Sequence, residues 1–235
     1  MSAINEFITK LNDGWSNLST EEILSSALSE FGHSLIFASS MGAEDQILTH
    51  IIGKNRLPIN IITLDTGRIF PETYDLIHRT NARYGNIVKV VFPEKSEVEE
   101  MVNTKGIDLF YESVENRQLC CKIRKINPLK QVLTDKKAWI TGLRRTQSQT
   151  RTEMKLVEWD SSFNLFKIYP LIDWSEEKVW NTINEHNIPF NVLHNKGFPS
   201  IGCQPCTRAI SPGEDLRSGR WWWENPETKE CGLHK

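Results

Sequence analysis

Short apolar runs alternate with amphipathic segments up to residue 141 of the chain. Four of these runs have the length and composition of strands, and helical patterns follow the first three. Their residues are apolar at successive positions, which is typical of strands that helices cover on both faces. The pattern therefore predicts an α/β fold with a doubly wound, mainly parallel sheet. The predicted strands are residues 34–38, 60–64, 87–92 and 138–141.

Two helix N-termini and one change in composition and periodicity complete the predicted organisation. Ser and Thr followed by two glutamates at residues 19–22, and Ser175 followed by another two, are residue types favoured at helix N-termini. From Pro189 onward Pro, Gly and Trp become frequent and the periodicity fades. We expect residues 1–200 to form the α/β domain and residues 201–235 an irregular appendage, within one structural domain overall.

The composition is that of a globular protein and excludes several classes of function. The chain has 235 residues, of which 39% are hydrophobic, and a formal net charge of -2. This charge provides no general attraction to nucleic acid or anionic membranes. No apolar run approaches the roughly 20 residues that cross a bilayer, and residues 1–15 lack the features of a signal peptide. We therefore expect a cytoplasmic protein with neither nucleic acid nor membrane among its partners.

Four of the five cysteines form two doublets that suit a metal centre. Cys120 and Cys121 are adjacent in a basic stretch of helical character, and Cys203 and Cys206 form a C-x-x-C. Disulfides are rare in a reducing compartment, which leaves metal ligation, redox catalysis or burial for these thiols. Four thiolates are the ligand set of a tetrahedral zinc ion and also of a 4Fe-4S cluster. The sequence therefore predicts one metal centre held by all four cysteines.

Two features favour the cluster over zinc. Adjacent helical residues point about 100° apart, so Cys120 and Cys121 reach separate corners of a cluster more easily than they reach one ion. Residues 116–152 carry ten Lys and Arg side chains against one acid, Asp135, and these cations would stabilise an anionic cluster. Zinc bound by four thiolates is equally anionic, so the charge pattern by itself leaves both centres open.

Cys231 stands apart from the two doublets. It lies four residues before the end of the chain, next to Gly232, and His234 follows three residues later. A leftover exposed cysteine is one interpretation of such a position. A nucleophile on a swinging tail is the other, because such a thiol can attack one molecule and present the product to a second.

Small polar residues follow the first two predicted strands. A Ser/Gly loop that leads into a helix offers hydroxyl and backbone N–H groups to a phosphate, although a simple helix cap is an equally good interpretation. Two such loops at neighbouring strand ends make a nucleotide crevice more plausible than one. The residues concerned are Ser39, Ser40 and Gly42 in the first loop and Leu64, Asp65 and Thr66 in the second.

Arginines gather after the fourth predicted strand and again in the tail. Guanidinium forks match phosphate and sulfate oxygens in paired hydrogen bonds, so these arginines indicate a small polyanionic ligand. Binding to a nucleic-acid backbone is the alternative, and the lack of interleaved aromatic residues disfavours it. Three consecutive tryptophans, residues 221–223, cannot all face inward. One of them could therefore belong to a docking surface for a partner or cover the ligand. The candidates for anion binding are Gly142, Arg144, Arg151, Arg217 and Arg220.

Seven motifs together resemble one known family. They are SSMGAED (39–45), LDTGRIFPETY (64–74), CCKIRKINPL (120–129), GLRRTQSQTR (142–151), SIGCQPCTR (200–208), PGEDLRSGRWWWE (212–224) and KECGLH (229–234). From about residue 34 to residue 235 the chain resembles the assimilatory adenylyl-sulfate reductases, relatives of the phosphoadenylyl-sulfate reductases within the ATP-pyrophosphatase-like group of Rossmann-type folds. The chain departs from the family pattern at Thr146 and Gln149, where an acidic residue and a proline are common.

The resemblance implies a complete reaction. Cys231 would be the nucleophile and Lys125 a further catalytic residue in the thioredoxin-dependent reduction of adenosine 5'-phosphosulfate to sulfite and AMP, through a cysteine S-sulfo intermediate, in sulfate assimilation and cysteine biosynthesis. The partner would be a thioredoxin or a glutaredoxin-like dithiol protein, and we also expect a homo-oligomer. By the same resemblance, a 4Fe-4S cluster would be bound by Cys120, Cys121, Cys203 and Cys206. The substrate site would comprise Ser39, Ser40, Gly42, Leu64, Asp65, Thr66, Gly142, Arg144, Arg151, Arg217, Arg220 and His234.

Three alternatives remain open at this stage. The first is a reductase that prefers the 3'-phosphorylated substrate or accepts both, although the branch with that preference usually lacks the four cluster cysteines. The second is an ATP-using pyrophosphatase of the RNA-thiolating kind, which would need a Gly-rich phosphate loop. The third is a zinc-stabilised nucleic-acid-binding module, whose affinity would depend steeply on salt.

Overall fold

The computed structural model of the protein describes residues 2–147 and 153–225. The chain divides into two compact units, and each is described by itself. The domain boundary expected at residue 200 stays a prediction. The first unit comprises Met1–Thr63, Leu76–Lys89 and Leu133–Phe190, and the second comprises Leu64–Asp75, Val90–Val132 and Asn191–Lys235.

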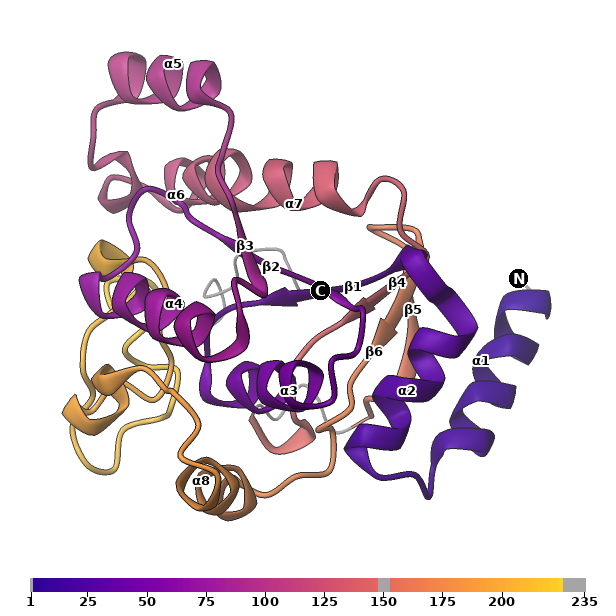
Figure 1. The fold of residues 1–235 in the computed structure, drawn as a ribbon. Coiled ribbons are helices and arrows are strands. Elements are labelled where there is room, and N and C mark those ends of the chain that lie inside the picture. Colours follow the sequence, from indigo (N-terminus) through magenta and orange to yellow (C-terminus); the bar gives the residue numbers. More distant parts are fainter. Residues whose placement is uncertain (1, 148–152, 226–235) are drawn as a thin grey trace. The chain divides into compact units, whose positions relative to one another are not determined.

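A six-stranded sheet, apart from the last residues of β2 and β3, forms the centre of the first unit (Figure 1). The strand order is β3-β2-β1-β4-β6-β5. β1 is parallel to β2 and β4, β4 is parallel to β6, and β5 is antiparallel to β6. The mainly parallel sheet that the sequence predicts is therefore confirmed. The strands are β1 (Leu35–Ser39), β2 (Asn60–Leu64), β3 (Val88–Val91), β4 (Ala138–Ile140), β5 (Val157–Asp160) and β6 (Leu165–Ile168).

The switch in strand order at β1 determines where a ligand site is expected. β1 lies between β2 and β4, so the connection leaving β1 and the connection entering β4 run in opposite directions across the sheet. In open α/β sheets, ligands bind outside the carboxyl ends of the strands at such a point. The loops after Ser39 and after Ile140 are the ones that meet this condition in the first unit.

Helices of the first unit pack on the sheet through apolar and aromatic side chains. Ser19 caps α2, because its side chain accepts a hydrogen bond from the Glu22 N–H while its own N–H donates to the Glu22 carboxylate. α1 and α2 meet strand β6 where Phe7 and Phe31 lie 5.1 Å and 5.7 Å, centroid to centroid, from Phe166. The helices are α1 (Ser2–Trp15), α2 (Thr20–Phe31), α3 (Ala43–Lys54), the later part of α4 (Pro71–Tyr84) and α8 (Glu176–Glu185).

The second unit is built around an interrupted helix. α6 (Val114–Cys121) leads through a π-helical turn (Lys122–Ile126) into α7 (Asn127–Leu133), and α5 (Lys95–Lys105) precedes them. Ser113 caps α6 by accepting a hydrogen bond from the Asn116 N–H, at 3.1 Å. A helical stretch around the first cysteine doublet is confirmed, whereas its π turn has no signal in the sequence.

The C-terminal part of the second unit is irregular, as the loss of periodicity predicts. Between residues 191 and 225 the described chain forms only short 3₁₀ helices, among them Val192–Lys196 and Gln204–Cys206. Backbone pairing between Thr207 and Arg220 closes this segment on itself. A core of buried side chains joins it to α5 and α6 within the unit, and this core comprises Met101, Leu109, Phe110, Cys121, Cys206 and Trp221.

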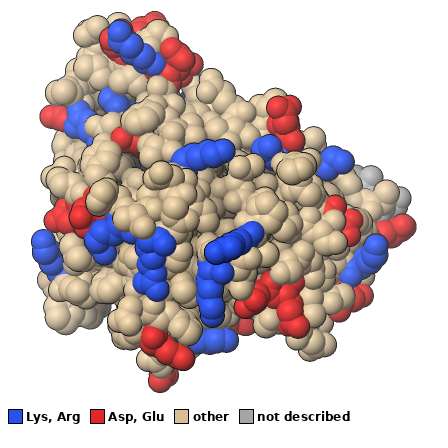
Figure 2. Space-filling model, viewed as in Figure 1, with Lys and Arg blue, Asp and Glu red and all other residues tan. Residues whose placement is uncertain are grey.

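The surface carries both signs of charge. Figure 2 shows Lys and Arg side chains and Asp and Glu side chains distributed over the same face. Such mixing agrees with the formal net charge of -2. None of the helices in residues 2–147 and 153–225 combines the length and the hydropathy that a bilayer crossing requires.

Candidate functional site

The candidate site residues fall into both units, and three of them lie outside the described residues. Ser39, Ser40, Gly42, Gly142 and Arg144 are in the first unit. The second unit contains Leu64, Asp65, Thr66, Lys125, Arg217, Arg220 and the four cysteines of the two doublets. Arg151, Cys231 and His234 lie in the parts of the chain that the structure does not describe.

Asp45 organises the loop that follows β1. Its Oδ2 accepts hydrogen bonds from the Ser40 N–H at 2.6 Å and the Ser40 hydroxyl at 2.7 Å, and its Oδ1 accepts one from the Gly142 N–H at 3.1 Å. Ser39 turns inward as well, because its Oγ accepts a hydrogen bond from the Met41 N–H at 3.0 Å. Asp45 therefore joins the loops at the carboxyl ends of β1 and β4, the two neighbouring strands at the switch point.

Burial raises the pKa of Asp45 to about 6. The hydrogen bonds from Ser40 and Gly142 oppose this shift, because they stabilise the carboxylate, while the charge of Glu44 adds to it. The loop thus contains a carboxyl group whose charge changes in the mildly acidic range. A negative charge here would oppose an incoming anion, and protonation would remove that opposition.

Gly142 leaves the space that Asp45 occupies. A Cβ at position 142 would collide with Asp45 Oδ1 and would lie 3.0 Å from the Glu44 Cβ and 3.1 Å from the Asp45 backbone nitrogen. The glycine of the GLRR motif is therefore required by close packing between the two loops. This is a reason for the residue that the sequence alone did not reveal.

Arg144 is held by a partner that sequence reasoning missed. Its Nε lies 2.8 Å from Glu44 Oε1, and its Nη1 donates to the Thr146 hydroxyl at 3.0 Å and to the Trp174 carbonyl at 3.2 Å. Gln147 donates a further hydrogen bond to Glu44 Oε1 at 2.9 Å. In this arrangement Arg144 positions the loop that leads to residue 151. Glu44 and Asp45 in SSMGAED were the available signal for such a partner, since a loop that binds an anion rarely needs acidic residues.

Both cysteine doublets line one pocket in the second unit. The Tyr111 hydroxyl donates to the Pro205 carbonyl at 2.7 Å, and the Gln204 N–H donates to the Arg68 carbonyl at 2.8 Å, which holds the C-x-x-C turn in place. We call this the thiol pocket, lined by Arg68, Phe110, Arg117, Cys120, Cys121, Arg124, Lys125, Cys203, Pro205 and Cys206. Residues distant in the sequence are thus brought together as the spacing predicts.

The thiols of the two doublets influence one another. Burial, together with the nearby Cys203 and Cys121 as potential like charges, raises the pKa of Cys206 to about 12. Burial also raises the pKa of Cys120, with Cys203 adding to the shift. Burial opposes ionisation of Cys203 too, but Lys125, the Thr66 hydroxyl and nearby arginines together lower its pKa. The pocket therefore has one activated thiol among thiols that resist ionisation in the absence of a bound cation.

The two candidate metal centres differ in the donor geometry that they need. Among the described residues, no group of three or more Cys, His, Asp or Glu side chains is arranged to hold a metal ion. Tetrahedral zinc needs four donors at about 2.0–2.3 Å from one point. No site for a metal ion is shown among the described residues, and both the zinc site and the 4Fe-4S cluster stay predictions.

Cationic side chains surround the thiol pocket. Arg220 is buried, and its guanidinium lies 4.7 Å from the ring centre of Trp221. Gly202 makes room for it, because a Cβ there would lie 2.9 Å from Arg220 Nη1 and closer still to the rest of the guanidinium. Arg220 Nε has no hydrogen-bond partner within the described part of the chain. Arg217 occupies the preceding turn, where its N–H donates to Asp215 Oδ1 at 2.8 Å.

The loop after β2 faces the thiol pocket through Thr66. The Thr66 hydroxyl lies 3.2 Å from Cys203 Sγ, and its carbonyl accepts a hydrogen bond from Arg124 at 2.7 Å. Asp65 accepts hydrogen bonds from the Gly67 N–H at 2.7 Å and the Tyr74 hydroxyl at 2.8 Å. Leu64, at the end of β2, is partly buried. Thr66 is therefore placed beside a thiol, a neighbour that its position in the sequence did not suggest.

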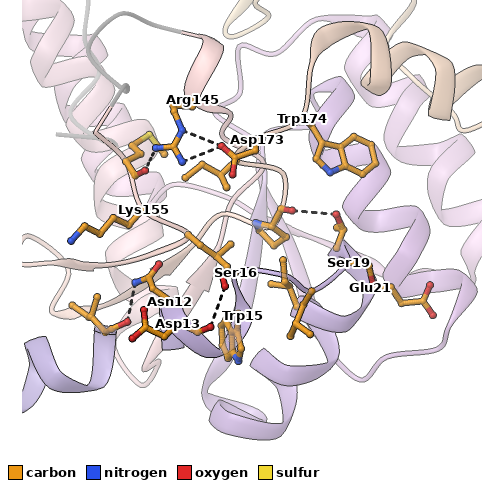
Figure 3. A pocket seen from close by; sticks show the side chains of 18 of the residues that line it. Asn12, Asp13, Trp15, Ser16, Ser19, Glu21, Arg145, Lys155, Asp173 and Trp174 are labelled. Carbon is orange, nitrogen blue, oxygen red and sulfur yellow. Dashed lines mark hydrogen bonds and ion pairs between the residues drawn. The ribbon is translucent and has the colours of Figure 1, made fainter. Parts of the chain in front are cut away.

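A cavity of about 880 Å³ lies elsewhere in the first unit, beside α1 and α2 (Figure 3). Arg145 points into it and donates to Asp173 Oδ1 and to the Met154 carbonyl. Thr20, which also lines the cavity, donates to the Pro170 carbonyl at 3.2 Å. Among the described residues, none of those expected to bind substrate or metal or to act in catalysis lines this cavity. It is therefore not part of the candidate site.

Comparison with known proteins gives a consistent result. Residues 34–209 match the family model of the phosphoadenosine phosphosulfate reductase domain. A protein of Allochromatium vinosum named adenosine 5'-phosphosulfate reductase is 54% identical over 91% of this chain and 83% of its own length. One of the same name from Agrobacterium fabrum is 50% identical over 86% of this chain and 78% of its own.

Solved structures agree with these relatives at the level of the fold. The crystal structure of phosphoadenylyl-sulfate reductase from Candida auris superposes with a TM-score of 0.76 and 28% identity, over 87% of this chain and 97% of that one. FMN adenylyltransferase of Candida glabrata has a TM-score of 0.57 and 16% identity, over 90% of this chain and 74% of that one, which shows a shared fold alone.

Proposed function

Since this chain belongs to the phosphoadenosine phosphosulfate reductase family, we propose that it reduces adenosine 5'-phosphosulfate to sulfite and AMP in sulfate assimilation. The observation that carries the proposal is the 54% identity, over 91% of the chain, to a relative that bears the name of this activity. The chain is therefore an oxidoreductase that acts on a sulfur group. The reaction needs reduced thiols, and we place it in the cytoplasm as part of the same proposal.

The loops at the switch point are proposed to bind the adenylyl part of the substrate. The N–H groups at the start of α3 and the Gly142 loop face the carboxyl ends of β1 and β4, where nucleotides bind in this class of sheet. Reduction of the 3'-phosphorylated substrate is the second candidate, favoured by the name of the family. The relatives in Allochromatium and Agrobacterium, named for the unphosphorylated substrate, favour the first.

We propose that Cys120, Cys121, Cys203 and Cys206 hold a 4Fe-4S cluster. Four thiols that line one pocket, with no carboxylate or imidazole among the lining residues, are the donor set that such a cluster takes. When bound, it would supply a compact charged centre that fixes both cysteine segments and tunes the electrostatic field beside them. The surrounding side chains of Arg68, Arg117, Arg124 and Lys125 support the proposal, because they offset the charge of four thiolates.

In the first chemical step, we propose that the Cys231 thiolate attacks the sulfur of the sulfate-phosphate anhydride. A Cys–S–SO₃⁻ bond forms, the bond from sulfur to the bridging oxygen breaks, and AMP leaves with the electron pair. The substrate is anionic at the point of attack, so cations must offset its charge before an anionic nucleophile can approach. Lys125, Arg151, Arg217 and Arg220 are assigned this task, and cations of this kind also favour a thiolate over a thiol.

In the second step, a dithiol protein of the thioredoxin or glutaredoxin type is proposed to release sulfite. Its first thiolate attacks the Cys231 sulfur, a mixed disulfide forms, and sulfite leaves with the electron pair of the S–S bond. The partner's second thiolate then attacks the sulfur of the partner's first cysteine in the mixed disulfide. The Cys231 thiolate is released, and the partner is left oxidised as an intramolecular disulfide. The sulfate sulfur has then gained the two electrons that the dithiol lost.

One experiment separates this proposal from its rivals. The full chain is purified without oxygen, its iron and acid-labile sulfide are measured, and sulfite release is assayed with thioredoxin and each of the two adenylyl sulfates. We expect about four iron and four sulfide per chain, and sulfite from adenosine 5'-phosphosulfate. Zinc in place of iron would reject the cluster. ATP hydrolysis without sulfite release, or salt-sensitive RNA binding, would favour a different function.

The matched variant is Cys231→Ser. It should bind adenosine 5'-phosphosulfate, release no AMP from it and form no sulfite, because serine lacks the nucleophilic thiolate. Retained turnover would reject Cys231 as the nucleophile while leaving the family assignment intact.

A further inference from the structure

Three aromatic rings, two of them exposed and the third, Trp223, partly buried, form a group on the second unit. The ring centroids of Tyr111 and Trp222 are 6.2 Å apart, those of Tyr111 and Trp223 4.5 Å, and those of Trp222 and Trp223 4.8 Å. Tyr111 is 45% exposed and Trp222 40% exposed. We call these three residues the aromatic cluster. None of them lines the thiol pocket, so the proposed chemistry does not explain their exposure.

The aromatic cluster is held in place from beneath. Phe110, which is buried, lies 4.6 Å from Tyr111 and 6.4 Å from Trp223, centroid to centroid. The Tyr111 hydroxyl donates to the Pro205 carbonyl, and the neighbouring Trp221 is buried with its backbone N–H donating to the Cys206 carbonyl at 3.1 Å. Rings that are already fixed lose little conformational freedom when a partner covers them, which favours binding.

The aromatic cluster lies close in the sequence to Cys231, the proposed nucleophile. The described chain ends at Asn225, two residues after Trp223, and Cys231 follows six residues later. A fully extended residue spans at most about 3.6 Å, so the Cα of Cys231 stays within about 22 Å of Asn225. A folded protein of about 100 residues has a radius of gyration near 13 Å. Any protein that reaches the Cys231 sulfur is therefore large enough to cover this part of the surface.

We propose that the aromatic cluster is the docking surface for the dithiol protein that releases sulfite from Cys231. This inference rests on the proposed function, and it adds a contact surface that the chemistry alone does not supply. Tyr and Trp are enriched among the residues that carry most of the binding energy in protein interfaces. The partner is a thioredoxin-type protein with two thiols, which contributes the electron pair for the exchange described above.

The test compares a protein reductant with a small one. Sulfite release by the full chain is measured against rising thioredoxin concentration and, separately, with dithiothreitol, which needs no docking surface. For Trp222→Ala we expect the half-saturating thioredoxin concentration to rise about tenfold or more. The dithiothreitol rate and the first-turnover release of AMP should stay within about twofold of the parent chain, because the reacting groups are unchanged. Trp222→Phe, which keeps an aromatic ring, should recover most of the affinity.

Phe92→Ala is the matched control. Phe92 is 63% exposed, belongs to the same unit, and has no ring contact with the aromatic cluster among the described residues. This control should leave all three measurements unchanged. An unaltered half-saturating concentration in Trp222→Ala would overturn the docking proposal, and so would an equal loss with dithiothreitol. Failure of the parent chain to release AMP would instead overturn the proposed function itself.

A second measurement needs no substitution in this chain. Thioredoxin that lacks its second cysteine is trapped as a mixed disulfide with Cys231, and backbone hydrogen exchange is compared with the free chain. We expect slower exchange around Tyr111 and Trp222 and no change around Phe92. Protection confined to residues after 225 would overturn the proposal. So would an oligomer that dissociates in Trp222→Ala with thioredoxin affinity intact, since the rings would then contact a second copy of the chain.

Discussion

Arg117 and Glu224 form a buried ion pair with two parallel hydrogen bonds. Arg117 Nε lies 2.8 Å from Glu224 Oε1, and Arg117 Nη2 lies 2.8 Å from Oε2. The two side chains are 0% and 3% exposed. Arg117 stands on α6 three residues before Cys120, and its guanidinium also lies 4.8 Å from the ring centre of Trp221. The pair thus joins the cysteine-bearing helix to the end of the described chain within the second unit.

Glu224→Gln tests what this pair contributes to stability. Loss of the carboxylate charge leaves a buried guanidinium without compensation, so we expect the free energy of unfolding to fall by about 3–5 kcal/mol in urea titrations. Glu99→Gln is the control, because the Lys95–Glu99 pair is mostly exposed and such pairs contribute less than about 1 kcal/mol. Equal effects of the two substitutions would contradict the assignment of a buried structural pair.

Gly142→Ala tests the contact between the two loops of the first unit. The added methyl group must displace Asp45, which breaks its hydrogen bond from the Gly142 N–H. We expect the dissociation constant for AMP to rise about tenfold or more, and the melting temperature to fall, because overpacking costs about 1–3 kcal/mol. Gly14→Ala in α1, where the added Cβ meets no tertiary neighbour within 4 Å, should leave AMP binding unchanged and raise the melting temperature slightly, because Ala favours a helix. Unaltered AMP binding in Gly142→Ala would remove this loop from the site.

Asp45→Asn tests the buried carboxyl group through pH. The pKa of Asp45 is raised from 3.8 to about 6 in the folded chain. Its contribution to stability is therefore full below pH 3.8 and is lost as the pH rises through 6. The stability of Asp45→Asn relative to the parent should rise between pH 4 and pH 7, by on the order of 2–3 kcal/mol.

Urea titrations at several pH values measure this difference. Glu99→Gln, at an exposed position, is the control variant measured across the same range. A constant difference for Asp45→Asn would show that the Asp45 carboxyl is already ionised at pH 4.

Lys125→Ala tests the cation that the π turn presents to the thiol pocket. We expect kcat/KM for adenosine 5'-phosphosulfate to fall about 100-fold with the fold intact, because the anionic attack loses one of its compensating charges. Lys122→Ala in the same turn is the matched control, since Lys122 is exposed and does not line that pocket. A rate for Lys125→Ala within twofold of the control would exclude Lys125 from the catalytic set.

The sequence predicted strands β1 to β4 and missed the last two strands, β6 and β5, at one edge of the sheet. Residues 60–64 are a strand as predicted, because their apolar side chains are buried by the unit around them. Strands β5 and β6 were missed, since Glu158 and Lys167 interrupt their apolar pattern. Lys167 is nonetheless buried and pairs with Asp160 of the adjacent strand, a contact that only the pairing of β5 with β6 creates.

The candidate site was predictable in its residue types and less so in its contacts. The two cysteine doublets line one pocket, as ligand chemistry indicated. The partners of Arg144 and Gly142 were not predictable, because Glu44 and Asp45 lie about 100 residues earlier in the sequence and meet them only through the pairing of β1 with β4. The spacing of residues in the sequence can indicate which side chains are reactive. The side chains that contact them depend on the order in which the strands pair.

The π turn between α6 and α7 has a consequence for insertions and deletions. A π turn holds one residue more than an α-helical turn, and one residue corresponds to about 100° of rotation. Removing a single residue from Lys122–Ile126 would let α6 run into α7 as a regular helix. Because the π turn accommodates its additional residue within one turn, Cys120 and Cys121 would keep their direction relative to buried Leu129 in that shorter helix. The additional residue therefore determines how the turn itself presents its side chains, Arg124 and Lys125 among them, to the thiol pocket.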